Sequence, residues 1–130
     1  MKSTSPSFSG TEEIAARPID LKCEYAVNPI GLDVSKPRFS WVLSHQKRGQ
    51  YQTAYQIMVS SSLESLKSNA GDVWDSGKVS SSCSTHVIHE GIPPESGKTY
   101  YWKVRWWDRD DQVSPWSDVA RFDMGLYRVD

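Results

Sequence analysis

Hydrophobic and polar residues alternate along most of the chain after Pro18, with the period of two that half-buried β-strands show. Turn-forming runs such as Asn-Pro-Ile-Gly at 28–31 interrupt the alternation. Strands are predicted at seven stretches: 19–25, 37–43, 52–61, 73–79, 84–89, 99–108 and 118–125. The stretch 62–72, SLESLKSNAGD, is predicted as a helix of one or two turns.

In three of these strands the alternation predicts which side chains point inward, because successive residues of a strand face opposite sides. In the first strand the inward set is Ile19, Leu21, Cys23 and Tyr25. In 52–61 one face carries Thr53, Tyr55, Ile57 and Val59, and the other carries Ala54, Gln56, Met58 and Ser60. In 99–108 the inward set is Tyr100, Trp102, Val104 and Trp106, and the outward set is Tyr101, Lys103, Arg105 and Trp107.

Short strands at this spacing, with almost no helix, predict an all-β fold. The expected architecture is a seven-stranded antiparallel β-sandwich of the fibronectin type III or immunoglobulin kind over residues 18–126. One shared core is predicted to contain Trp41, Tyr55, Ile57, Tyr100, Trp102, Val104 and Phe122. Residues 1–17 are expected to form a flexible N-terminal arm, and 127–130 to begin a linker to a following domain.

Composition narrows the classes of partner. The 130 residues fit one domain, and the net charge is -1, with 15 basic and 16 acidic residues spread along the chain. No basic stripe indicates nucleic-acid binding, and no apolar run approaches the ~20 residues of a membrane-spanning helix. The first residues lack the apolar core of a signal peptide, but this leaves cytoplasmic and extracytoplasmic locations both open.

Candidate chemistry in the sequence is sparse, and no cofactor or metal is expected. Asp72 and Asp75 flank a tryptophan, and Asp108, Asp110 and Asp111 crowd one loop without the spacing of a calcium-binding loop. We interpret the loop as a solvated acidic turn. The histidines are also poorly placed for a shared metal: His45 lies in a polar loop, and His86 and His89 are expected to face opposite sides of a strand.

The two cysteines, Cys23 and Cys83, have no metal-binding or redox-motif spacing. We expect them not to be bonded to each other, because Cys23 is predicted to point inward and another strand should separate the two.

Four blocks of sequence, taken in order, resemble the N-terminal domain of bacterial α-L-rhamnosidases. They are CEYAVNPIGLDVSKPRFSWVL, RGQYQTAYQIMVSS, VWDSGKV and SGKTYYWKVRWWD with SPWSDVARFDMGL, and the resemblance runs from about Pro18 to Leu126. It implies a fibronectin type III-like domain at the front of a large glycoside hydrolase. In that family a later helical-barrel domain carries the carboxylates that hydrolyse terminal α-L-rhamnose with inversion. We therefore expect no catalytic residue in this chain, which ends at Asp130.

The chain departs from the family pattern at two positions. The turn after Trp107-Asp108 usually contains glycine in the family, whereas here it is Arg109-Asp110-Asp111. His89 stands where an aromatic residue is expected. Both differences leave local geometry and packing open, and neither concerns catalytic chemistry.

Exposed aromatic side chains are the candidate contacts of this domain. Tyr101, Trp107 and Trp116 are candidates for binding either a sugar or another domain, and Tyr51 and Tyr127 are further aromatics expected at the surface. The motif SPWS at 114–117 resembles half of the W-S-x-W-S signature of cytokine receptors, in which tryptophans stack on arginines. By that resemblance, Trp116 is predicted to lie against Arg105 or Lys103, which would make it structural.

The sequence as a whole predicts a non-catalytic accessory domain of an α-L-rhamnosidase-like enzyme, which packs on and orients later domains. Its expected partners are other domains of the same polypeptide, and rhamnose-containing glycans are a second candidate. The alternative is a free-standing fibronectin-type module that binds carbohydrate or protein.

Overall fold

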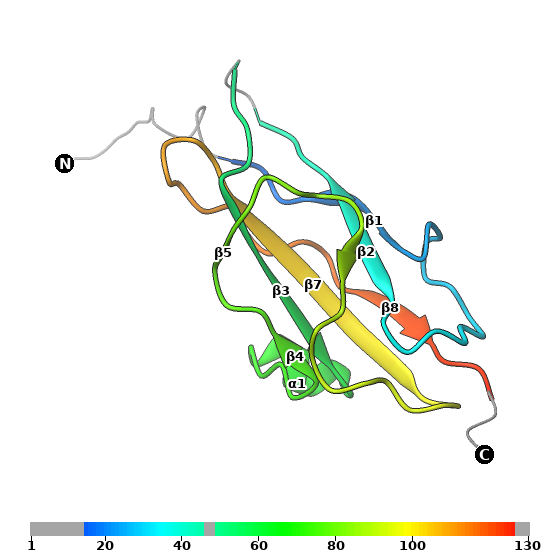
Figure 1. Cartoon of the computed structure of the whole chain (residues 1–130). Helices are drawn as coiled ribbons and strands as arrows, with labels where there is room; N and C mark the ends of the chain where they lie inside the picture. The colour runs from blue at the N-terminus through cyan, green and yellow to red at the C-terminus, as the bar shows by residue number, and fades with distance from the viewer. Residues whose placement is uncertain (1–14, 46–48, 127–130) are drawn as a thin grey trace.

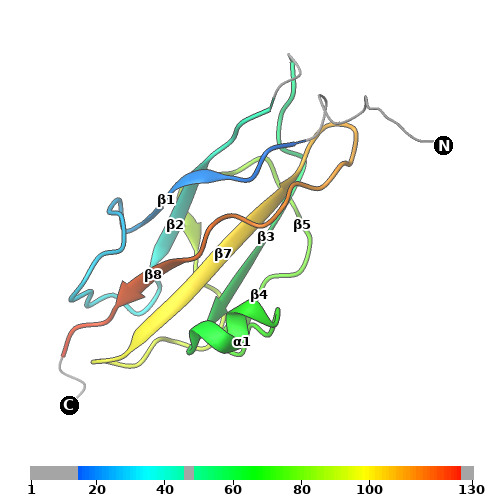
Figure 2. The same cartoon turned by 180° about the vertical axis from the view of Figure 1, so that it is seen from behind.

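The computed structural model describes residues 15–45 and 49–126, which form two antiparallel sheets packed face to face (Figures 1 and 2). One sheet has the order β1-β2-β6, with β1 at Ile19–Cys23, β2 at Arg38–Val42 and β6 at Val87–Ile88. The other has the order β4-β3-β7-β8, with β3 at Ala54–Ser60, β4 at Trp74–Asp75, β7 at Thr99–Trp107 and β8 at Ala120–Asp123. The predicted all-β sandwich is confirmed.

The strand predicted at 73–79 is interrupted. Its two halves are β4 and β5 (Val79–Ser80), and both pair with β3. Between them Gly77 has φ +65°, a conformation that glycine adopts without strain. Counting this broken strand once gives the seven strand positions that the alternation predicted.

The core lies between the sheets and contains all seven residues predicted for it. Trp41, Ile57, Trp102, Val104 and Phe122 are at most 2% exposed, and Tyr55 and Tyr100 are also buried. Phe39 packs against Trp102 and Phe122, with ring centroids 4.6 and 5.9 Å apart. Burying aromatic side chains of this size dominates the energetics of a small core.

The first strand corrects two inward assignments. Ile19 and Tyr25 are 46% and 61% exposed, whereas Cys23 is buried. The pairing of β1 with β2 shifts register between Ile19 and Lys22, and Asp20, Glu24 and Tyr25 have positive φ. An irregularity of this kind inserts an extra residue into the strand. Alternate side chains before and after it therefore no longer point to the same face of the sheet.

The second face of β3 is also more buried than predicted. Ala54, Met58 and Ser60 are at most 3% exposed. The helix α1 (Leu63–Lys67) lies against this end of the sheet, as Figure 2 shows, with Leu66 fully buried. Its N-terminus is capped by Ser62, whose hydroxyl accepts a hydrogen bond from the backbone amide of Ser65.

Other expectations can be compared with the described residues. Cys23 is buried and Cys83 exposed, and both are free, as predicted. Burial raises the pKa of the Cys23 thiol, and the negative charge of Glu24 adds to this effect. Most of the expected N-terminal arm and all of the expected linker at 127–130 lie outside the described residues, so those assignments stay predictions.

Candidate functional site

The outward face of β7 carries a ladder of aromatic rings and cations. The Cζ atom of Arg105 lies 5.3 Å from the ring centroid of Trp107 and 4.5 Å from that of Trp116. The Nζ atoms of Lys78 and Lys103 lie 5.0 and 4.7 Å from Trp107 and Trp116 respectively. The predicted stacking of Trp116 against Arg105 or Lys103 is confirmed, and Trp116 stacks with both.

The SPWS segment holds Trp116 in place through its two serines. The backbone amides of Ser114 and Ser117 donate to the carbonyls of Trp106 and Val104, at 2.8 and 2.9 Å. Their hydroxyls accept hydrogen bonds from the amides of the same two residues, at 3.1 and 3.0 Å. Each serine therefore satisfies both backbone groups of one β7 residue and leaves the side chain of Trp116 on the outward face.

Two cations of the ladder also donate hydrogen bonds to polar side chains. Arg105 Nε donates to Gln56 Oε1 at 3.0 Å, and Lys103 Nζ donates to Asn69 Oδ1 at 2.5 Å. Lys103 lies on the outward face as predicted, and its side chain is only 6% exposed. Burial lowers its pKa, and the nearby charge of Arg105 lowers it further. The indole faces of the ladder are thus occupied by the chain's own cations.

Asp108 belongs to the interior rather than to a solvated turn. Its Oδ1 accepts hydrogen bonds from the amides of Asp110 and Gln112, and its Oδ2 lies 3.0 Å from His45 Nε2. The Asp108 and His45 side chains are 0% and 5% exposed. Burial alone would raise the pKa of Asp108, but the hydrogen bonds from Gln112, His45 and Asp110 outweigh it and hold the pKa below its usual value.

The sequence contained a signal for this buried carboxylate. Position 108 continues the inward series of alternate residues that ends in Trp106, and the ring of His45 lies edge-on to Trp106 at 6.0 Å. The turn that Asp108 holds contains Asp111 at φ +60°, in the left-handed region that favours glycine. An aspartate tolerates this conformation better than most residues, which accounts for the missing family glycine.

The remaining titratable candidates have structural partners. Asp72 accepts hydrogen bonds from the hydroxyls of Ser60 and Ser61, at 2.8 and 2.6 Å. His89 is 1% exposed, and its ring packs edge-on against that of Trp74, with the ring centroids 5.2 Å apart. The imidazole ring thus packs where the family pattern has an aromatic residue. Within residues 15–45 and 49–126, no group of three histidine, cysteine, aspartate or glutamate side chains is placed to hold a metal ion.

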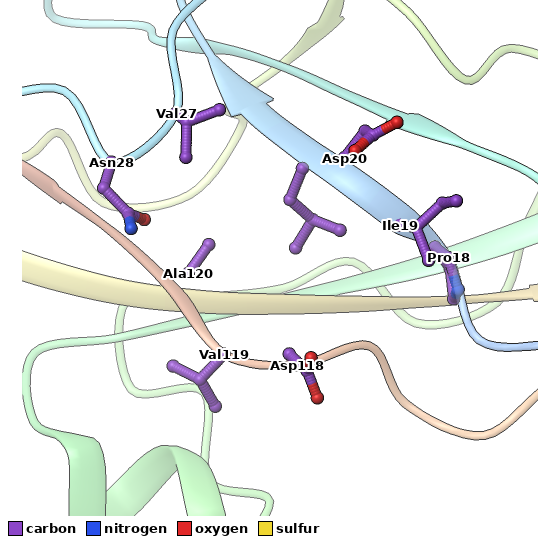
Figure 3. A pocket seen from close by; sticks show the side chains of 9 residues that line it. Pro18, Ile19, Asp20, Val27, Asn28, Asp118, Val119 and Ala120 are labelled. Atoms are coloured by element: carbon purple, nitrogen blue, oxygen red, sulfur yellow. The ribbon is translucent and has the colours of Figure 1, made fainter.

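A groove of about 300 Å³ lies where β1 approaches β8, and Figure 3 shows its lining. The lining side chains come from β1, from the loop that follows it and from the segment that leads into β8. They are Pro18, Ile19, Asp20, Leu21, Val27, Asn28, Asp118, Val119 and Ala120. Sequence reasoning missed this groove, because it forms between segments about a hundred residues apart.

A second hollow, of about 370 Å³, adjoins the groove, because Asn28, Val119 and Ala120 line both. Its other lining residues are Leu63, Lys67, Tyr101 and Arg121. We call the two hollows together the β1–β8 groove.

The structure therefore separates the three candidate contact residues. Trp107 and Trp116 belong to the ladder, whereas Tyr101 lines the β1–β8 groove. All three are partly buried, and Tyr51 is 57% exposed. Tyr127 lies outside the described part of the chain. No helix in that part is long and apolar enough to cross a membrane.

Comparison with known proteins gives a consistent result. The family model described as Rha78A-like, N-terminal immunoglobulin domain matches residues 18–128. An α-L-rhamnosidase of Formosa agariphila is 46% identical over 99 residues, which are 76% of this chain and 10% of the relative. One from an Alteromonas species is 45% identical over 113 residues, which are 85% of this chain and 12% of that protein.

Solved structures agree with these relatives. An α-L-rhamnosidase structure from Dictyoglumus thermophilum superposes with a TM-score of 0.83 at 54% identity, covering 85% of this chain and 12% of that one. The Streptomyces avermitilis enzyme, solved with L-rhamnose, gives 0.80 at 42% identity, over 85% and 10% of the two chains. A human fibronectin type III domain, at 18% identity and a TM-score of 0.56, shares the fold. This chain thus spans about a tenth of the length of its curated relatives.

Proposed function

Because the chain belongs to the family of Rha78A-like N-terminal immunoglobulin domains, we propose that it is a non-catalytic accessory domain of a longer α-L-rhamnosidase. In this proposal the domain packs on later domains of the same polypeptide and orients them, while the longer protein hydrolyses terminal α-L-rhamnose. The observation that carries it is the short span of the chain relative to α-L-rhamnosidases that it matches over most of its own length.

The carboxylates of the described residues support the non-catalytic part of the proposal. Inverting glycosidases place two carboxyl groups about 6.5–9.5 Å apart, and the acid member usually has a raised pKa. Asp108 and Asp72 have lowered pKa values and are held by hydrogen bonds. Asp20 and Asp118 line the groove, but Asp118 is paired with Arg17 at 3.0 Å, and its side chain is 91% exposed.

The proposal is tested with an aryl α-L-rhamnoside and two proteins, the 130-residue chain and the longer gene product that contains it. We expect turnover by the longer product and none by the chain alone. Turnover by the pure chain that Asp20→Asn or Asp118→Asn abolishes would overturn the non-catalytic assignment. A gene that encodes no further domain would instead favour the free-standing binding module.

A further inference from the structure

We propose that the β1–β8 groove is the surface on which a neighbouring domain of the same polypeptide docks, through a ridge of apolar side chains. This inference rests on the proposed function, and it adds the place of the contact and the chemistry of the partner surface.

The groove concentrates exposed apolar side chains that come from separate parts of the chain. Ile19, Val27 and Val119 are 46%, 64% and 39% exposed, and Leu63 at the far end is 38% exposed. Single exposed apolar residues are normal on a protein surface, whereas a contiguous group in a concave site indicates an interaction. Tyr101 adds an aromatic ring with a polar end, a side chain that is enriched at interfaces.

The outer sheet face provides an internal contrast. Ile88 is 44% exposed, a fraction like that of Val119, but it lies on the open face of the β1-β2-β6 sheet. The register places Lys22 opposite Ser40 and Arg38 opposite Ile88 on the same face. Arg38 thus adjoins Ile88 there, and Ile88 lines neither described hollow, whereas Val42 is paired with Ile19 of the groove.

The edge of β8 beside the groove is already occupied. The amide of Arg121 donates to Asn28 Oδ1 at 3.0 Å, and the amide of Asp123 donates to the carbonyl of Pro29 at 3.0 Å. Leu32 also donates its amide to the carbonyl of Asp123. A partner therefore cannot extend the sheet at these groups by adding a strand. Recognition must use side chains that enter the groove.

Charges at the two ends specify the partner further. Asp20 and Asp118 flank the β1 end, where Arg17 neutralises one of the two carboxylates. Lys67 and Arg121 flank the Tyr101 end, and both are exposed. The complementary ridge is apolar along its length, with a basic side chain toward Asp20 and acidic ones toward Lys67 and Arg121.

A domain of the same polypeptide is the occupant because this chain matches only 10% and 12% of the length of two relatives. Such a neighbour is covalently tethered, so even a modest contact forms at high effective concentration. Interfaces between domains of one chain commonly cover about 600–1,500 Å², and this surface is more polar than that of obligate oligomers. A shallow apolar groove with charged ends fits that description.

The test compares two matched substitutions in two contexts, the 130-residue chain and the longer polypeptide. Val119→Asp places a charge in the centre of the groove, and Ile88→Asp places the same charge at a similarly exposed apolar residue on the open sheet face. In the isolated chain both variants should lower the melting temperature by similar amounts. In the longer polypeptide Val119→Asp should lower it by several degrees more than in the isolated chain, and Ile88→Asp should not.

Hydrogen exchange gives a second readout that does not depend on any variant. Amides at 117–121 should exchange at least tenfold more slowly in the longer polypeptide than in the isolated chain, and amides at 87–89 should be unchanged. Unchanged exchange at 117–121, together with a Val119→Asp effect equal in both contexts, would overturn the inference. Protection at another surface of this domain would then leave the proposed function standing, whereas no protection anywhere would contradict both.

Discussion

The two faces of the nine-residue strand β7 are covered in different ways. Its inward row, Tyr100, Trp102, Val104 and Trp106, is at most 4% exposed and packs against apolar side chains. Its outward row, Tyr101, Lys103, Arg105 and Trp107, is covered mainly by cations stacked on indole rings, except for Tyr101 in the groove. The inward face stabilises the fold by burial, and on the outward face the chain's own cations cover the indole rings.

This contrast bears directly on function. Where the chain covers its own aromatic rings, as at Trp107 and Trp116, the ring faces are taken and a sugar would have to displace a cation. Where it leaves apolar side chains exposed, as at Val27 and Val119, a partner surface gains by covering them. This contrast supports our proposal that the groove is the domain contact, and it favours a structural role for the ladder.

The largest effect is expected on the inward face. Trp102→Ala should lower the free energy of unfolding by about 3–5 kcal/mol, the scale for deleting a buried large aromatic side chain. That is a large fraction of the ~5–15 kcal/mol that stabilises a typical domain. The measurement is urea denaturation of the 130-residue chain. Trp107→Ala, in the same strand but on the outward face, is the control, and a shift as large as that of Trp102→Ala would contradict the distinction between the faces.

Asp108 extends the inward row with a charge, and removing it should cost about 2–4 kcal/mol. Asp108→Ala leaves the amides of Asp110 and Gln112 without their acceptor and removes the partner of His45. Asp108→Asn, which retains an oxygen acceptor without the charge, should cost less. Equal losses for the two variants would show that the hydrogen bonds to this side chain contribute little.

The same residue predicts a dependence of stability on pH. Because the pKa of Asp108 is lower in the folded chain than the ~3.9 of an unfolded aspartate, its charge stabilises the fold above about pH 4. This contribution is lost as the pH falls through the folded pKa. The difference in unfolding free energy between the chain and Asp108→Asn should therefore shrink from about pH 5 downward, as denaturation series at several pH values would measure. A constant difference would contradict the lowered pKa.

A smaller effect is expected on the outward face. Trp116→Ala should cost about 1–3 kcal/mol, because two cation–π contacts of about 0.5–1 kcal/mol each are lost with some apolar cover. Trp116→Phe keeps a ring and should recover part of the loss. A double-mutant cycle with Arg105→Met should give a coupling of about 0.5–1 kcal/mol, and a coupling of zero would mean that the stack does not contribute.

The smallest expected effect is on sugar binding. Titration of the chain with rhamnose-containing oligosaccharides should leave its tryptophan fluorescence unchanged, because the ladder's indole faces are covered. Quenching that saturates and disappears in Trp116→Ala would instead favour the carbohydrate-binding module. Quenching retained in that variant but lost in Tyr101→Ala would place a sugar in the groove.

Much of the fold could be predicted from the sequence, because alternation reports directly which face of a strand is buried. It succeeded along the inward row of β7, where the backbone is regular, and at Trp41 in β2 and Phe122 in β8. It failed at Ile19, because the positive φ of Asp20 and the shifted register are not encoded in a pattern of polarity. It also missed the burial of Met58, because α1 covers the second face of β3.

The candidate site was predictable to the extent that it is local. The stacking of Trp116 followed from the outward direction of Arg105 and from the SPWS motif. The burial of Asp108 could have been found by continuing the alternation one step beyond Trp106. The groove could not have been found in this way, since its lining comes from β1 and from the segment leading into β8, which are far apart in the sequence.

The serines of SPWS also constrain the number of residues in the segment that runs alongside β7 from Ser114 to Ala120. Ser114 and Ser117 are three positions apart, but their partners Trp106 and Val104 are two apart, so the segment contains one extra residue. A second extra residue follows, because Ala120 is three positions beyond Ser117 and pairs with Trp102. Because the two extra residues shift the alternation twice, the side chain of Phe122 again points inward. Deleting a single residue between 115 and 119 would turn Phe122 to solvent, whereas deleting two would preserve its direction. Natural length variation here is therefore expected in steps of two.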